Sequence, residues 1–169
     1  MASMGTMVPP TDAPPLDEAA DHVLSDDVNW LLNRVWLGFG ERRAAALDAL
    51  DLTVREHVVL DVLSRVDATQ LQLGAIARID KSALTLTIDS LERKRLVVRE
   101  PDPRDRRAKR PRLTPLGRDR CAAASRVSRQ VQDQILDSLP KATREIFVST
   151  LREYAFGQFS QATYFAQSR

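Results

Sequence analysis

The segment "PDPRDRRAKRPRLT", residues 101–114, concentrates the side chains of this chain that are best suited to chemistry. It holds six basic side chains, two aspartates and three prolines. Guanidinium groups bind phosphates and carboxylates through forked N–H donors, so such a segment suits a polyanion. A charge run is, however, most often a solvated loop. The elements on either side must therefore decide between an ordered basic hairpin and a basic linker.

The charge of the chain is unevenly distributed. The net charge is only +2, yet residues 93–120 hold twelve basic and four acidic side chains. No lysine or arginine precedes Arg34. A basic focus on an otherwise acidic chain indicates one polyanion site and argues against a uniformly basic surface.

Composition limits the class of protein. The 169 residues suit one ordinary domain, and 43% hydrophobic content allows a packed core. Only 5% of residues are aromatic and six are glycine, which favours helices over a β-sandwich or barrel. A single cysteine, Cys121, provides no disulfide framework or metal cluster. We find no signal peptide or membrane-spanning window, and expect a cytoplasmic protein without metal or cofactor.

The N-terminal third predicts a disordered tail followed by a helix. Residues 1–15 have little to bury, so we expect them to be disordered. From about Asp26 to Leu50 the apolar residues recur at helical spacing, on two neighbouring stripes. The stripes comprise Val28, Leu31, Leu32, Val35 and Phe39, and Trp30, Arg34 and Leu37. Such a helix needs burial on more than one side, so residues 16–52 are predicted to form a dimerisation region.

Residues 53–114 predict a winged helix-turn-helix. Thr53 and Glu56 form a capping box that opens one helix. Two further helices follow, over Leu71–Arg78 and from an N-cap at Asp80. The last of these has its apolar positions at Leu84, Ile88 and Leu91. Residues 96–100 read as a strand, and residues 108–114 as a returning strand that Pro111 confines to an edge or a bulge.

Residues 115–169 predict C-terminal dimerisation helices. Thr114 caps a long helix with Pro115 at its first position, running to about Ser138. A last helix begins at Pro140 and carries several large apolar residues. The fold class is thus mainly α with a small β wing, a winged helix-turn-helix flanked by N- and C-terminal dimerisation helices.

The stretch "IDKSALTLTIDSLERKRLVVREPDPRDRRAKRPRLTPLGRD" resembles the recognition helix and wing of the MarR family of bacterial transcription regulators. The matching features are the entry "DLTVRE" and, in order, Asp105, Arg107, Leu113, Thr114 and Gly117. The resemblance extends over roughly residues 26–165. It implies a homodimer with interlocking terminal helices, two recognition helices in successive major grooves of a pseudo-palindromic operator, and wings in the flanking minor grooves. It also implies a repressor that a phenolic or aromatic acid releases.

The recognition helix is the first predicted DNA contact. Its N-terminal turn can bind phosphates, and an outward hydroxyl or leucine can contact a base edge or a thymine methyl. The predicted residues are Lys81, Ser82, Thr85, Leu86, Thr87, Ser90 and Arg93. Family members often carry arginines where this chain has Leu86 or Thr87, and Ser90. The alternative is an ordinary surface helix.

The wing is the second predicted DNA contact. The resemblance makes Arg107 the minor-groove residue and Asp105 the carboxylate that orients it. Arg104, Arg106, Lys109 and Arg110 are predicted to meet phosphates. Because the recognition helix lacks the usual arginines, we expect this hairpin to carry more of the binding energy than in typical relatives. The usual glycines of the two turns that flank the recognition helix are here Arg78 and Arg95.

A possible effector pocket involves Trp30, Arg34, Trp36 and His57. An arginine among aromatic rings can clamp the carboxylate of an aromatic acid. The alternative is that the tryptophans belong to a dimer core and His57 only fills space. Cys121 has two readings as well: a redox thiol activated by Arg118 and Arg120, or a buried structural thiol.

The sequence therefore predicts a ligand-responsive, dimeric, sequence-specific DNA-binding regulator. One alternative is an architectural or protein-interaction winged-helix module without sequence preference. An enzyme is not expected, because the two histidines, His22 and His57, lie far apart and no phosphate-cradling loop or nucleophile elbow is present.

Overall fold

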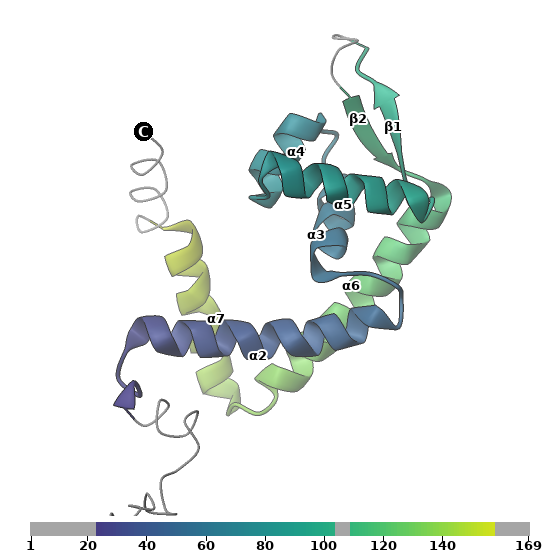
Figure 1. The fold of residues 1–169 in the computed structure, drawn as a ribbon. Coiled ribbons are helices and arrows are strands. Elements are labelled where there is room, and N and C mark those ends of the chain that lie inside the picture. The colour runs from purple at the N-terminus through teal and green to yellow at the C-terminus, as the bar shows by residue number, and fades with distance from the viewer. Residues whose placement is uncertain (1–22, 104–108, 158–169) are drawn as a thin grey trace, which may run out of the picture. The chain divides into compact units, whose positions relative to one another are not determined.

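A computed structural model describes residues 23–103 and 109–157. The chain divides into two compact units, Met1–Gly38 and Phe39–Arg169. The described residues form six helices and one two-stranded antiparallel hairpin (Figure 1). The elements in chain order are α2 (Val28–Asp48), α3 (Val54–Arg65), α4 (Gln70–Ala77), α5 (Lys81–Arg93), β1 (Val97–Pro101), β2 (Lys109–Leu113), α6 (Pro115–Leu136) and α7 (Lys141–Phe156). The predicted winged helix-turn-helix with flanking helices is confirmed.

Helix α2 begins in the first unit and ends in the second. Its apolar residues in the first unit include Val28, Leu32 and Trp36, which are 69%, 54% and 71% exposed. Near its end, Leu47 is fully buried in the core of the second unit. The N-terminal part of α2 thus presents an apolar surface to solvent.

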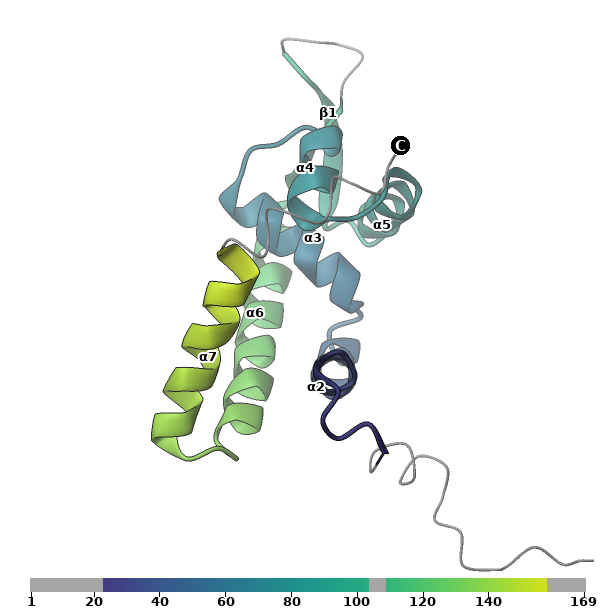
Figure 2. The same cartoon turned by 90° about the vertical axis from the view of Figure 1, so that its left-hand side faces the viewer.

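The core of the second unit is built around α3. This helix contacts α4, α5, α6 and β2, so it links the helix-turn-helix to the hairpin and to the long helix α6. Figure 2 shows α3, α4 and α5 grouped below the hairpin. The three predicted core positions of α5, Leu84, Ile88 and Leu91, are all buried. Their 3–4 spacing gives α5 one apolar face and leaves the opposite face to solvent.

Side-chain caps set the starts of four helices. Thr53 Oγ1 accepts from the Glu56 N–H at 3.1 Å and Glu56 Oε2 accepts from the Thr53 N–H at 2.7 Å, which is the predicted capping box. A second box, Thr69 with Gln72, opens α4 one residue earlier than predicted. Asp80 and Thr114 cap α5 and α6 as predicted. These local contacts satisfy N–H groups that the helices leave unpaired.

The basic segment is flanked by an ordered hairpin. Strands β1 and β2 pair antiparallel, with Val97 opposite Leu113 and Arg99 opposite Pro111. Each strand has one unpaired edge in this two-stranded sheet, so the missing N–H of Pro111 is tolerated there. Residues 104–108 lie outside the described residues.

The turns on either side of α5 hold arginines in an unusual conformation. Arg78 and Arg95 have φ angles of 52° and 59°, in the left-handed region that favours glycine. Arg78 is the C-cap of α4, and Arg95 follows α5. These are the two positions at which the sequence predicted tight turns with arginine in place of glycine.

Helix α6 packs closely against the segment between α5 and β1 through Gly117. A Cβ at Gly117 would lie 1.9 Å from the Leu96 carbonyl oxygen. The Thr114 hydroxyl bonds the Arg95 and Leu96 carbonyls at 2.8 and 3.3 Å, which draws the two segments together. Helix α6 ends two residues before the predicted Ser138, and α7, which lies wholly within the described residues, buries none of its side chains.

Gly117→Ala is expected to destabilise the fold, because the added methyl group overlaps a backbone oxygen that hydrogen-bonded segments hold in place. We expect the free energy of unfolding in urea to fall by about 2–3 kcal/mol. Gly40→Ala is the matched control, because its Cβ would meet nothing within 4 Å and alanine is the better helix former. An unchanged unfolding free energy for Gly117→Ala would contradict the close approach of α6 to Leu96.

Candidate nucleic-acid interface

The exposed helix α5 is fixed to the core by a buried carboxylate. Glu56 is 3% exposed, and its Oε1 accepts from the Ser90 hydroxyl at 2.7 Å. Lys94 Nζ lies 3.1 Å from both carboxylate oxygens. Burial raises the pKa of Glu56, but the bonds from Thr53, Ser90 and Lys94 outweigh it and hold the pKa below its usual value. The C-terminal half of α5 is therefore tied to the start of α3.

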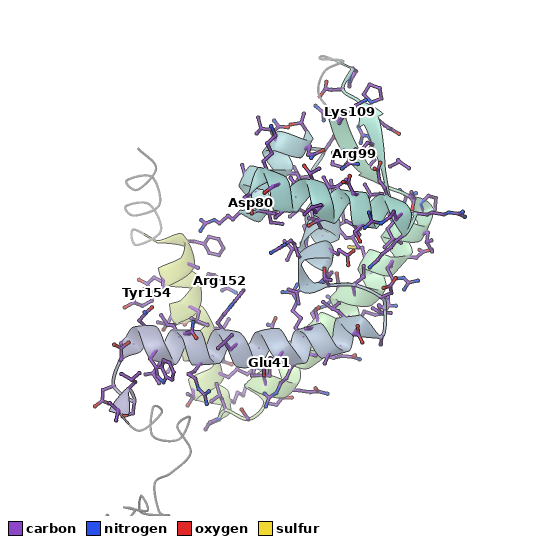
Figure 3. The ribbon with its side chains drawn as sticks, in the orientation of Figure 1. Glu41, Asp80, Arg99, Lys109, Arg152 and Tyr154 are labelled. Atoms are coloured by element: carbon purple, nitrogen blue, oxygen red, sulfur yellow. The ribbon has the colours of Figure 1, made fainter. Side chains whose placement is uncertain are left out.

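Arg99 ties the hairpin to the same helix. Its Nη2 lies 2.6 Å from Asp89 Oδ1, and its Nη1 bonds Glu92. The Arg99 backbone N–H also donates to Glu92 Oε1 at 2.9 Å. Figure 3 shows Asp80 at the start of α5, with Arg99 and Lys109 on the hairpin. Helix and hairpin thus form one rigid element, and the acids of α5 are neutralised from the hairpin side.

The outward face of α5 holds most of the predicted DNA contacts. Lys81, Ser82, Leu86 and Arg93 are exposed, and Leu86 is 69% exposed. Thr85 is half-buried. The face combines a cationic residue at each end of the helix with an apolar centre.

The hydroxyl groups on this face already use their hydrogens. The Thr85 hydroxyl donates to the Lys81 carbonyl at 2.9 Å and accepts from Gln70 Nε2 at 3.1 Å. The Ser82 hydroxyl donates to Asp80 Oδ1 at 2.6 Å. In this arrangement both hydroxyls present acceptor lone pairs, which suit the N4 or N6 amino donors of cytosine and adenine.

Two predicted contact residues of α5 lie elsewhere. Thr87 is only 6% exposed and donates to the Ala83 carbonyl at 2.7 Å, because positions 84, 87, 88 and 91 form the buried face. The Ser90 hydroxyl is taken by Glu56. The Thr87 side chain is therefore not available to DNA in this structure, whereas Ser90 is half-buried and its DNA contact remains a prediction.

The hairpin side chains fall into three groups. Lys109 is exposed, as a phosphate contact requires. Arg110 is held by Asp102 and Asp67, and its side chain is only 15% exposed, which the sequence did not predict. Arg104, Asp105, Arg106 and Arg107 lie outside the described residues, so their predicted roles remain predictions.

Comparison with known proteins assigns the fold to a family. A model of the MarR family matches residues 50–108. A MarR-family transcriptional regulator from Rhodococcus sp. RHA1 is 30% identical, over 79% of this chain and 95% of that chain, with a TM-score of 0.71. The chain belongs to the MarR family.

Two structures of CouR are also similar to this MarR-family chain. CouR from Rhodococcus jostii RHA1, bound to p-coumaroyl-CoA, is 30% identical over 79% of this chain and 94% of that chain, with a TM-score of 0.68. The transcriptional repressor CouR bound to a 23-mer DNA duplex is 26% identical over 78% and 94%, with a TM-score of 0.73.

MarR-family proteins are non-enzymatic DNA-binding transcription factors, and this chain is therefore a transcription regulator. Within residues 23–103 and 109–157, no helix is long and apolar enough to cross a membrane. The same residues hold no group of three or more side chains that could bind a metal ion.

The predicted effector residues of this MarR-family chain are divided between the two units. Trp30, Arg34 and Trp36 belong to the first unit, where Trp36 is exposed. His57 belongs to the second, where it is 4% exposed. That the four residues share one pocket remains a prediction.

His57 lies in a buried polar cluster that includes an arginine not predicted from the sequence. Arg43 Nη2 donates to His57 Nδ1 at 2.9 Å, and Ser125 Oγ lies 3.2 Å from Nε2. Ser128 Oγ lies 3.3 Å from Nδ1. Because arginine can only donate, Nδ1 accepts and Nε2 carries the hydrogen. Burial and the nearby Arg43 charge lower the pKa of His57, so the ring is neutral.

Arg43 has unused capacity to bind an anion. Its Nε is buried and has no hydrogen-bond partner among the described residues. Burial lowers the pKa of Arg43, and the charge of Asp61 offsets this effect only in part. An anionic group bound at this cluster would accept a hydrogen bond from Arg43 Nε and would also pair with the Arg43 charge.

The surroundings of Cys121 fit a buried structural thiol and do not fit an activated redox thiol. It is 4% exposed, and burial raises the pKa of its thiol. The two arginines expected to activate it bond backbone carbonyls instead, Arg118 to Leu113 and Arg120 to Leu50. A thiol with a raised pKa is a weak nucleophile at neutral pH.

His57 should make stability depend on pH below about pH 6.5. Its folded-state pKa lies below the ordinary 6.5, so the unfolded chain binds a proton that the folded chain does not. This contribution is complete above pH 6.5 and is lost as the pH falls towards the folded-state pKa. Wild type should lose up to about 1.4 kcal/mol per pH unit more than His57→Gln, as measured by urea unfolding at pH 7.5 and 5.5. Equal losses in both proteins would refute the assignment.

Proposed function

We propose that the chain is a homodimeric transcription repressor that binds a pseudo-palindromic DNA operator through α5 and the hairpin of each copy. The observation that carries the proposal is the outward face of α5, which exposes Lys81, Leu86 and Arg93 on a helix fixed by Glu56 and Arg99. A helix rigidly held at its back can enter a major groove in one orientation. The repressor CouR, a MarR-fold relative, binds a DNA duplex, which supports the proposal.

Apolar surface at both ends of the chain supports a dimer. In the first unit, the α2 residues Leu31, Leu32 and Trp36 are exposed. In the second unit, Ile146 and Phe156 of α7 are 65% and 81% exposed. Large apolar side chains at this density on helices indicate surfaces that a second copy covers. We assign residues 16–52 and 115–169 to dimerisation, as the sequence predicts.

The proposed contacts fall into two classes. Lys81, Ser82, Thr85, Leu86 and Arg93 face the major groove. In the hairpin, Arg107 would enter the minor groove with Asp105 as its orienting carboxylate, and Arg104, Arg106 and Lys109 would meet phosphates. Minor-groove arginines and phosphate contacts make affinity depend steeply on salt.

The alternative is an architectural or protein-interaction module without sequence preference. It would use the same basic hairpin, but the outward face of α5 would not select a base sequence. The apolar residue Leu86 is exposed at the centre of that face. This exposure favours sequence-specific binding, because an interface that contacts only phosphates would not require an apolar side chain there.

A selection of bound duplexes from a random pool, followed by footprinting, tests the proposal. We expect one enriched pseudo-palindrome with half-sites about one helical turn apart, protected by two copies of the chain. Binding should fall by a factor of about 10³ or more between 50 and 200 mM salt. Leu151→Asp, which places a charge on the apolar surface of α7, should weaken protection of both half-sites, whereas Ser149→Asp should not.

Enrichment of no sequence would overturn the repressor proposal and favour the architectural alternative. Protection of a single half-site by one copy would overturn the dimer while leaving a sequence-specific interface in place.

We further propose that a small aromatic or phenolic acid releases the protein from DNA. The structure of CouR from Rhodococcus jostii RHA1 is bound to p-coumaroyl-CoA, the CoA thioester of a phenolic acid. In this chain, Arg43 has a buried Nε without a partner in the described residues, next to His57. Its donor set suits the anionic group of such a ligand. That Arg34 clamps a carboxylate beside the rings of Trp30 and Trp36 remains a separate prediction from the sequence.

Titration of a panel of phenolic acids against tryptophan fluorescence and DNA release tests this proposal. An active ligand should lose about tenfold or more in affinity with Arg43→Gln, and Arg34→Ala serves as the parallel test of the sequence prediction. An active ligand that both variants bind as tightly as wild type would exclude these residues as its anion site. A panel without effect on DNA binding would contradict ligand release by this class.

A further inference from the structure

Five charged side chains meet where the hairpin contacts the linker between α3 and α4. They form the wing-base cluster: Asp67, Glu100, Asp102, Arg110 and Arg112. Arg110 lies at its centre. Its Nε donates to Asp102 Oδ2 at 2.6 Å and its Nη1 donates to Asp67 Oδ1 at 2.7 Å. One guanidinium therefore bridges the hairpin and the linker.

The cluster is shielded from solvent at its inner end. The side chain of Arg110 is 15% exposed and that of Asp102 is 5% exposed, whereas Asp67 is 55% exposed. Charge-assisted hydrogen bonds at low exposure are strong and hold both partners in one geometry. To reach a DNA phosphate, Arg110 would have to give up its bond to the buried carboxylate of Asp102, which is costly.

Arg112 makes a second connection between the same two segments. Residues 110 and 112 lie on one face of β2, because side chains alternate along a strand. Arg112 Nη2 lies 3.2 Å from Asp67 Oδ2, and its Nε lies 3.2 Å from Glu100 Oε2. Two cations thus face three carboxylates, and the cluster has no excess positive charge to offer a polyanion.

Asp67 gives the cluster its connection to the helix-turn-helix. It lies two residues before Thr69, the N-cap of α4. Helix α4 in turn contacts α5 and β2. A displacement of Asp67 would therefore shift the start of the helix-turn-helix relative to the hairpin.

We propose that Arg110 is a positioning residue, which with Asp67 and Asp102 sets the hairpin at a fixed place relative to α4 and α5 and makes no phosphate contact. This replaces the sequence prediction that Arg110 meets DNA. The inference rests on the proposed function, since the geometry that it fixes is that of the two DNA-contacting elements.

Asp67→Asn separates the two roles by the sign of its effect. If Arg110 is a phosphate contact, loss of the negative charge frees Arg110 and Arg112, so DNA binding tightens and its salt dependence becomes steeper. If Arg110 positions the hairpin, binding to the selected operator weakens, and we expect about a five- to tenfold loss with an unchanged salt slope. Tighter binding or a steeper slope would overturn the proposal.

Asp61→Asn is the matched control, since Asp61 is also a surface aspartate paired with an arginine. Its side chain is 36% exposed and lies 2.9 Å from that of Arg65 within α3, outside the wing-base cluster. Its operator affinity should stay within about twofold of wild type. Arg110→Gln should match Asp67→Asn in operator affinity, and the double variant should lose little more than either single one. A reduction of the salt slope by about one in Arg110→Gln would instead indicate a phosphate contact.

Amide hydrogen exchange measured without DNA tests the positioning role of Arg110 separately from the proposed function. In Asp67→Asn, amide hydrogen exchange should accelerate at β2 and at the start of α4 together, and Asp61→Asn should leave both unchanged. If no duplex is enriched but exchange accelerates, the proposed function fails while the positioning role stands. If the operator is bound but exchange is unchanged in Asp67→Asn, the positioning role fails alone.

Discussion

The buried carboxylate of Glu56 is the contact on which the interface depends most. It accepts the Thr53 N–H that starts α3 and the Ser90 hydroxyl of α5, and it pairs with Lys94 beyond the end of α5. A carboxylate removed from water needs hydrogen-bond and ion-pair partners. Its burial therefore holds Thr53, Ser90 and Lys94 in their places. The orientation of α5 follows from that requirement, and with it the direction in which Lys81, Leu86 and Arg93 face.

Charge in this molecule serves two separate purposes. Arg99, Arg110 and Arg112 are bound by acids and hold the hairpin against the helix-turn-helix. Lys81, Arg93 and Lys109 remain on the surface. The basic segment of the sequence therefore contains more cationic side chains than are available to contact DNA. This division explains how a chain with a net charge of only +2 combines a rigid hairpin with a local polyanion site.

The features that the sequence predicts correctly are those that depend on contacts between residues close together in the chain. The caps at Thr53, Asp80 and Thr114 act within three residues, and the apolar face of α5 follows from its own spacing. The predicted DNA contact at Thr87 comes from a family position, but residue 87 lies three residues after Leu84 and four before Leu91, on the buried stripe of α5. The sequence did not predict the ion pair of Arg110 with Asp67, whose partners are 43 residues apart. Contacts of Arg43 with His57 likewise depend on packing that no local pattern records.

We propose that α5 contacts base edges through its exposed centre, at Leu86. Replacing each thymine of the selected operator by uracil removes one methyl group and changes nothing else at the major-groove edge. We expect one such replacement in each half-site to weaken wild-type binding by about tenfold or more, and Leu86→Ala to be insensitive to the same replacement, because each of the two lost methyl contacts amounts to roughly 0.8 kcal/mol. The account would be contradicted if no thymine position mattered, or if Leu86→Ala lost as much affinity as wild type at that position.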